Sequence, residues 1–145
     1  MAAAIGVHII EEYALNFTGW AAAALSAPIS WDDFHLVNAG VTLYIVSCAA
    51  VGWRAPAFCL SGAALLVCNA LGFHLGASLV SRMYSPGTVT ALLLFVPVGL
   101  GAYRSAARRG LLTRRVLAIS IAIGLLWHAF LALVFYIKYF APLYS

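Results

Sequence analysis

The amino-acid sequence predicts an all-α fold: a polytopic bundle of transmembrane helices that forms one domain over residues 1–145. Of the 145 residues, 65% are apolar and only 8% are charged, whereas about a quarter of the residues in a soluble domain are charged. So few charged side chains cannot cover the surface of a water-soluble protein, and we expect most of that surface to face lipid. The short chain favours one compact bundle over two domains.

The apolar residues are grouped into five long segments. A helix needs roughly 20 apolar residues to cross the hydrocarbon core of a bilayer, and the segments approach or exceed this length. The predicted spans are residues 2–25, 33–53, 57–81, 88–103 and 116–140. The bundle has four spans if the first segment, which carries several polar residues, does not cross fully. Asp32 is the expected cap of the second span, and residues 104–115 form the longest predicted loop.

Basic residues are concentrated on one side of this predicted bundle. With five spans, one side holds six arginines and the other holds only Arg82 and Lys138. The six are Arg54, Arg104, Arg108, Arg109, Arg114 and Arg115. Cytoplasmic loops carry an excess of basic residues, so we expect the amino terminus to lie in the cytoplasm. The net charge of +4 arises almost entirely from this arginine cluster and indicates contact with the lipid bilayer, with no nucleic-acid partner.

The predicted spans also contain many polar side chains. A charge at the centre of a bilayer costs several kcal/mol, so intramembrane ionisable residues commonly face the bundle interior and have a function. The polar residues within the spans are His8, Glu11, Glu12, Asn16, His35, Asn38, Asn69, His74 and His128.

The strongest of these signals is on the first segment. His8, Glu11 and Glu12 stand at positions i, i+3 and i+4, so they share one face of a helix. Two neighbouring carboxylates in a low dielectric cannot both ionise unless a cation, a proton or a protonated histidine lies between them. This requirement favours a functional role over a purely structural one. Asn69 and His74 are five residues apart and face the same way only if their helix is central or distorted.

The stretch His8-Ile-Ile-Glu11-Glu12 resembles the signature of the HXXEE-domain family of small bacterial integral membrane proteins. The later stretch Tyr84-Ser-Pro-Gly87, followed by Thr90-Ala91, resembles that family's second hallmark. The resemblance extends over essentially the whole chain and implies a protein of the bacterial inner membrane. The function of the family is uncharacterised, so the resemblance implies no reaction. It does imply that His8, Glu11, Glu12, Tyr84, Pro86 and Gly87 are important.

The first functional hypothesis is a membrane metalloenzyme. Histidine and carboxylate one turn apart on a helix form the ligand geometry that helical bundles use for zinc or iron. The expected metal ligands are His8, Glu12, His74 and His128. Asn69, Asn38 and His35 are expected to support these ligands, and Glu11, Glu12 and Tyr84 to be catalytic. The substrate would be a lipid or another apolar small molecule that enters sideways from the bilayer.

Two alternatives remain open at this stage. The same cluster could act without a metal in an isomerase or cyclase of an apolar substrate, with one carboxyl group as acid and a neighbouring carboxylate or histidine as base. A band of His, Glu and Asn could also serve a small transporter or a proton relay, although the internal repeats typical of transporters are missing from the sequence. Gly72 and Gly76 have the small-residue spacing that would allow close contact between helices in a homo-oligomer.

Overall fold

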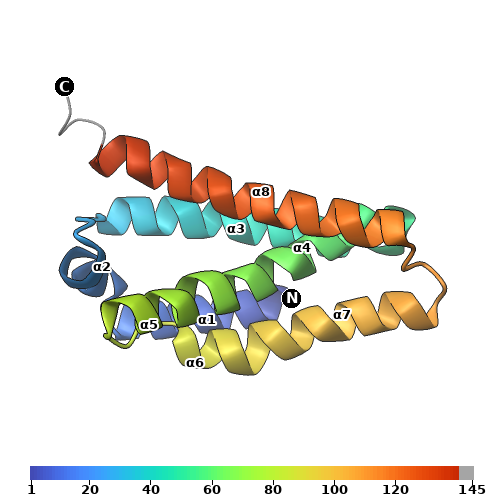
Figure 1. The fold of residues 1–145 in the computed structure, drawn as a ribbon, viewed down its shortest axis with the longest axis horizontal. Helices are drawn as coiled ribbons and strands as arrows, with labels where there is room; N and C mark the ends of the chain where they lie inside the picture. Colours follow the sequence, from blue (N-terminus) through green and yellow to red (C-terminus); the bar gives the residue numbers. More distant parts are fainter. Residues whose placement is uncertain (141–145) are drawn as a thin grey trace.

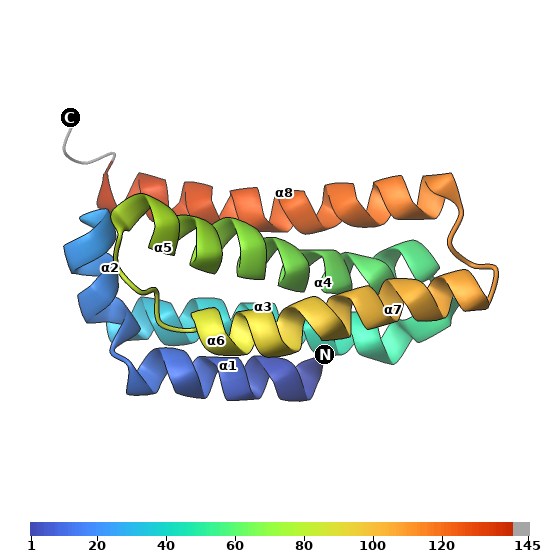
Figure 2. The ribbon, with the colours of Figure 1, turned by 60° about the horizontal axis from the view of Figure 1, so that its bottom comes forward.

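The computed structural model describes residues 1–140, in which helices alternate with short turns and no strand occurs. Long helical rods run roughly side by side (Figures 1 and 2). The first part of the chain forms α1 (Ala2–Ala14), α2 (Phe17–Leu25), α3 (Trp31–Val51) and the 3₁₀ turn η1 (Gly52–Arg54). The second part forms α4 (Pro56–Cys68), the π-helix η2 (Asn69–Leu75), α5 (Gly76–Ser81), α6 (Thr88–Thr90), the π-helix η3 (Ala91–Phe95), α7 (Val96–Arg108) and α8 (Arg114–Tyr139).

Four helices in residues 1–140 are long and apolar enough to cross a membrane. They are Trp31–Arg54, Pro56–Ser81, Thr88–Arg108 and Arg114–Tyr139. Large apolar side chains point outward along them, including Leu36, Val80 and Leu126, which are 73%, 88% and 68% exposed. A surface of this kind is stable when its solvent is lipid. The predicted all-α membrane bundle is therefore confirmed.

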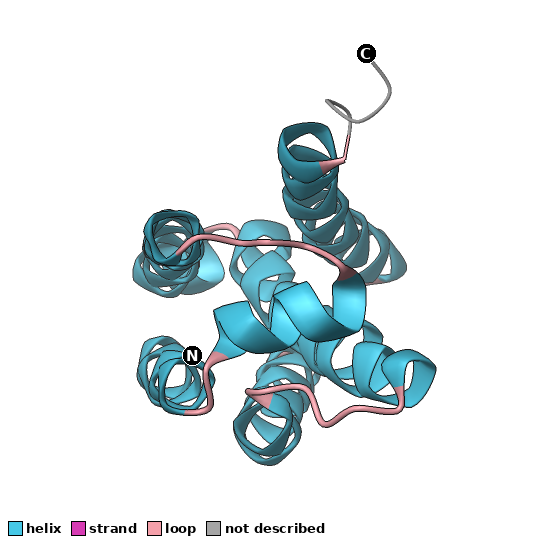
Figure 3. Cartoon of the chain, turned by 90° about the vertical axis from the view of Figure 1, so that its left-hand side faces the viewer, coloured by secondary structure: helices cyan, strands magenta, loops and turns pink. Residues whose placement is uncertain are grey.

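The first segment, predicted as one span over residues 2–25, is two helices instead. Asn16 adopts the left-handed conformation (φ 54°), and its side chain accepts a hydrogen bond from the Gly19 amide. Asparagine tolerates this conformation better than most residues, and the break turns α2 across the end of the bundle (Figure 3). Helix α1 has 13 residues and is therefore about 20 Å long at 1.5 Å per residue. It is shorter than the hydrocarbon core, so the four-span alternative holds.

Two further boundaries differ from the predicted ones. The arginines of the predicted 104–115 loop largely continue the helices, since α7 runs to Arg108 and α8 begins at Arg114. Arginine is a good helix former and favours the last turn, and the chain turns only at Gly110, which has φ +70°. Ser30, not Asp32, caps α3, because its hydroxyl accepts from the Asp33 amide and donates to the Asp33 carboxylate.

Helix α4 is the centre of the bundle and packs against α3, α7 and α8. Glycines on the neighbouring helices permit this close packing. A Cβ added to Gly124 on α8 would lie 2.7 Å from the Ala64 Cβ and 2.9 Å from the Leu65 amide nitrogen. A Cβ added to Gly99 on α7 would lie 3.0 Å from the Ala63 carbonyl oxygen. The backbones therefore approach as closely as small residues allow, as is typical of membrane helices.

We predict that Gly124→Ala lowers the thermal stability of the purified protein, because the new methyl group would force α8 away from the α4 backbone. Overpacking of this kind costs about 1–3 kcal/mol. The measurement is the apparent Tm in detergent. Gly101→Ala is the matched control, since nothing lies within 4 Å of an added Cβ there and alanine is the better helix former. An unchanged Tm in Gly124→Ala would contradict the close packing of α4 and α8.

Candidate functional site

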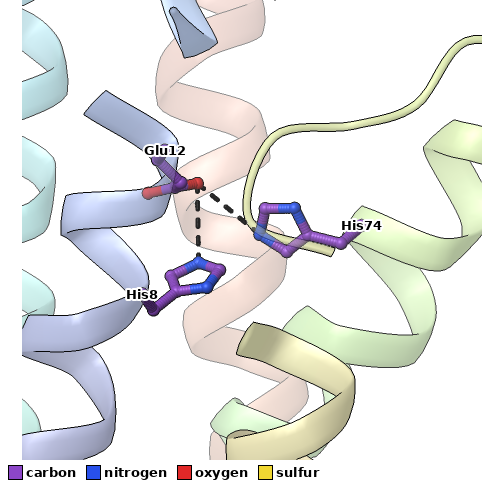
Figure 4. Close-up of side chains that lie close together, drawn as sticks. All are labelled: His8, Glu12 and His74. Carbon is purple, nitrogen blue, oxygen red and sulfur yellow. Dashed lines mark ion pairs between the residues drawn. The ribbon is translucent and has the colours of Figure 1, made fainter. Parts of the chain in front are cut away.

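Three buried polar residues converge between α1 and η2: His8, Glu12 and His74, here called the buried cluster. Their exposed fractions are 4%, 5% and 0%. The Nε2 atoms of both histidines lie 3.5 Å from the same carboxylate oxygen, Oε1 of Glu12. Figure 4 shows the carboxylate of Glu12 facing both rings. One ligand atom from each residue lies within 4.8 Å of the other two, so the cluster could hold a metal ion.

Both imidazole rings are oriented by hydroxyl groups on their other nitrogen. Nδ1 of His8 lies 2.9 Å from Oγ1 of Thr90, and Nδ1 of His74 lies 3.2 Å from Oγ of Ser85. These contacts direct both Nε2 atoms toward Glu12. A hydrogen bond to the distal nitrogen is how proteins fix metal-binding histidines. Nε2 of His74 is buried and has no hydrogen-bond partner, which is unusual for a polar atom unless a ligand completes it.

The π-helix η2 explains why His74 joins the cluster. In a regular α-helix the side chains of Asn69 and His74 would point in directions about 140° apart. The sequence analysis therefore predicted that both face the bundle interior only if their helix is central or distorted. The span Pro56–Ser81, which carries both residues, is central and distorted: residues 69–75 form i→i+5 hydrogen bonds. A π-turn brings residues five apart onto adjoining positions, so His74 reaches the cluster while Asn69 lines the cavity beside it.

The loop of residues 82–87 closes over the cluster at Gly87. Its backbone has φ +94°, a conformation that side chains rarely adopt. An added Cβ would lie 2.6 Å from Cε1 of His8, 2.7 Å from Cε1 of His74 and 2.9 Å from Cγ of Glu12. The loop backbone therefore packs directly on all three side chains, and only glycine permits this contact.

The adjacent carboxylate of Glu11 has a different environment from that of Glu12. It accepts hydrogen bonds from the backbone N–H groups of Gly87, Val89 and Thr90 at 3.2, 3.4 and 2.8 Å. These groups lie at the start of α6, where the helix cannot satisfy them itself. Glu11 therefore caps α6 from another helix and secures the 82–87 loop.

Tyr84 adds a fourth hydrogen bond to this cap. Its hydroxyl donates to Oε1 of Glu11 at 2.5 Å. Burial and this bond to the carboxylate raise the pKa of the Tyr84 hydroxyl above its usual value, so it remains a proton donor at physiological pH. The structure thus places Glu11 and Tyr84 together, in contact with the loop and not with the histidines.

A cavity of about 150 Å³ adjoins the buried cluster. Asn38, Asn69 and His128 lie on its walls together with His8 and Glu12. His128, expected as a fourth ligand, packs against the Phe73 ring at 6.3 Å and is not a member of the three-residue cluster.

The remaining candidate, His35, is exposed on α3 and stacks on Trp31, with ring centroids 6.0 Å apart. It is outside both the cluster and the cavity lining.

Ser85 and Thr90, whose hydroxyls orient the two histidines, belong to the stretches that resemble the family's second hallmark, but the sequence indicated no role for either. Serine and threonine are common in membrane helices and loops, so their identity alone carries little information. The available signal was their place within or just after the Tyr84–Gly87 stretch, beside a glycine and a proline.

Fold and site together define a class: a helical membrane protein that encloses a His/Glu/His cluster beside an apolar cavity. The chain belongs to the family described as proteins of unknown function with the HXXEE motif, whose model matches residues 1–102. This confirms the resemblance seen in the sequence. The matched region contains the buried cluster, Glu11 and the 82–87 loop, and α8 follows it.

The chain is also similar to the uncharacterized protein YrkK of Bacillus subtilis (strain 168). The two are 27% identical over 145 aligned residues, which cover 91% of this chain and 89% of the relative. No solved structure matches the chain.

We predict that Gly87→Ala disrupts the site as well as the loop, because the added methyl group would collide with all three members of the cluster. The expected result is a lower apparent Tm together with loss of any bound metal. Gly52→Ala is the control for backbone strain: Gly52 has φ +55° but nothing within 4 Å of an added Cβ. Equal effects of the two substitutions would show that strain alone, and not crowding of the cluster, matters at Gly87.

Glu11→Gln should destabilise the protein, because a neutral amide accepts backbone hydrogen bonds less strongly and its NH₂ group opposes the N–H donors. Hydrogen bonds to a charged group contribute about 1.5–3 kcal/mol, so a clear drop in apparent Tm is expected. Asp32→Asn makes the same chemical change at an exposed carboxylate and should leave the Tm unaltered. If the Glu11→Gln protein were as stable as the wild type, the proposed capping of α6 by Glu11 would be contradicted.

Proposed function

We propose that the protein is an integral membrane enzyme in which His8, Glu12 and His74 bind a divalent metal ion, zinc or iron. One observation carries this proposal: two buried Nε2 atoms face a single carboxylate oxygen while hydroxyl groups hold both Nδ1 atoms. Metal–nitrogen and metal–oxygen distances of about 2.0–2.1 Å in a tetrahedral site separate neighbouring ligand atoms by roughly 3.3–3.4 Å. The two separations of 3.5 Å are close to this value.

The same distances favour a metal ion over a shared proton. An N–H···O hydrogen bond is typically about 2.7–3.2 Å long, shorter than either contact to Glu12. A carboxylate buried to this degree needs a positive charge close by if it is to remain ionised. One divalent cation would supply that charge and would also give the Nε2 atom of His74, which has no hydrogen-bond partner, a partner.

The substrate proposed for this site is a lipid or another apolar small molecule. Three protein ligands leave at least one coordination position open, and a metal ion there would supply Lewis-acid chemistry. Apolar side chains form most of the cavity wall, so water is largely excluded and polar contacts inside are strengthened. In this proposal Glu11 and Tyr84 hold the 82–87 loop over the reacting group and keep it in place.

A metal-free isomerase or cyclase would use the same three side chains for proton transfer, and metal analysis separates it from the metalloenzyme.

A proton relay across the bilayer is less favoured. Ile5, Leu66 and Phe95 line the cavity beside His8 and Glu12, and these three side chains offer no group that transfers a proton.

We also propose that the arginine-rich end of the bundle faces the cytoplasm. Arg104 and Arg108 on α7 and Arg114 and Arg115 on α8 lie at the connection between these two helices. The buried cluster lies toward the opposite end, next to α2, and would therefore occupy the outer half of the bilayer. Since α1 is short and begins partway along the bundle (Figure 1), the cytoplasmic placement of the amino terminus stays a prediction.

The metal content of the detergent-purified protein, measured by mass spectrometry, tests the proposal. We expect about one zinc or iron per chain in the wild type and loss of that metal in His8→Ala, Glu12→Gln and His74→Ala. His35→Ala is the matched control, because this histidine is exposed and outside the cluster. His128→Ala should also keep the metal, and its loss there would make His128 a fourth ligand.

A well-folded wild type without metal, even after incubation with zinc or iron(II), would overturn the metalloenzyme and favour the acid–base enzyme. Circular dichroism and gel filtration of each variant distinguish loss of ligands from loss of fold.

A further inference from the structure

The cavity at the buried cluster has a neighbour, a second cavity beneath α2. The second cavity measures about 300 Å³. Five residues line both cavities, so the two spaces adjoin: Phe17, Ile29, Phe73, Ala132 and Phe135. The two adjoining cavities, here together called the chain channel, extend from the cluster toward the end of the bundle covered by α2.

The chemistry of the channel changes along its length. At the cluster, side chains from α1, α3, η2 and α8 form a polar level: His8, Glu12, Asn38, Asn69 and His128. Beneath α2 the lining side chains are aliphatic and aromatic, with the hydroxyl group of Tyr136 as their one polar atom, and they include Leu25 and Phe140. A ligand that matches this gradient has one polar end and one long apolar chain.

The open side of the channel faces the membrane. Ala132 and Tyr136 on α8 line it and are exposed on the outer surface of the bundle, where the surrounding solvent is lipid. A molecule can therefore enter laterally between α2 and α8 without crossing water.

Asn69 indicates which polar group the ligand carries. Its Oδ1 atom is buried without a hydrogen-bond partner, and an amide oxygen only accepts hydrogen bonds. A hydroxyl group can donate to Oδ1 and still offer a lone pair to the buried cluster. A carboxylate cannot donate, and a hydrocarbon can do neither.

We propose that the substrate is a single-chain amphiphile of the long-chain alcohol class, with its hydroxyl at the buried cluster and its chain in the channel beneath α2. This inference rests on the proposed function, since the cluster is where the polar end would react.

Photolabelling with two diazirine-bearing dodecanol probes tests the proposal, using the full-length protein in phosphatidylcholine nanodiscs. A probe with its diazirine at the far end of the chain should label Leu25 and Tyr136. A probe with its diazirine beside the hydroxyl should label residues near Asn69 and His128. Unlabelled dodecanol should compete, and dodecane or dodecanoate should compete less.

Ala132→Trp should reduce channel labelling about tenfold, because an indole ring would fill the space shared by the two cavities. Leu133→Trp is the matched control: Leu133 is the next residue on α8, is 54% exposed and lines neither cavity. Metal content is measured on the same preparations and should be the same in both variants.

Equal labelling in the two variants, labelling confined to outward-facing residues, or reversed positions for the two probes would overturn the inference. These results leave the metal content of the wild type unaffected. A metal-free protein that still shows the expected labelling would instead overturn the proposed metalloenzyme, so the two failures are distinguishable.

Discussion

The first backbone N–H groups of helix α6 have no acceptor within the helix itself. The carboxylate of Glu11 accepts from Gly87, Val89 and Thr90, and the Ser85 carbonyl accepts from Thr88. In a membrane each unsatisfied backbone group costs several kcal/mol. This cap therefore stabilises the turn between the second and third of the four spans, and it fixes the loop whose Gly87 and Ser85 contact the buried cluster.

The two neighbouring glutamates contact different partners because of helical geometry. Successive residues of α1 point about 100° apart, so Glu11 faces the start of α6 while Glu12 faces the histidines. From the sequence alone it was not evident how two adjacent carboxylates could both be stabilised in a low dielectric. In the structure the two carboxylates have separate environments. Backbone N–H groups donate to Glu11, and the rings of His8 and His74 face Glu12.

Much of this architecture could be predicted because it depends on composition and on spacing within single helices. The spans follow from the thickness of a bilayer, and the shared face of His8 and Glu12 follows from the 3.6-residue repeat. The turn at Asn16 and the π-helix at residues 69–75 could not be predicted in the same way. Each depends on a local backbone conformation that tertiary contacts stabilise, and the pairing of Thr90 with His8 joins residues 82 positions apart.

The short α1 has a consequence for how the protein is made. During synthesis α1 emerges before the four spans, with a histidine and two carboxylates that are costly to leave alone in lipid. The amide of Thr90 that Glu11 accepts from is 79 residues further along the chain, and His74 also emerges much later. Helix α1 must therefore wait at the membrane surface, or be shielded there, until the second and third of the four spans have been inserted. Helix α1 thus takes its final place after helices that are synthesised later, and the buried cluster is completed only when those two spans have been inserted.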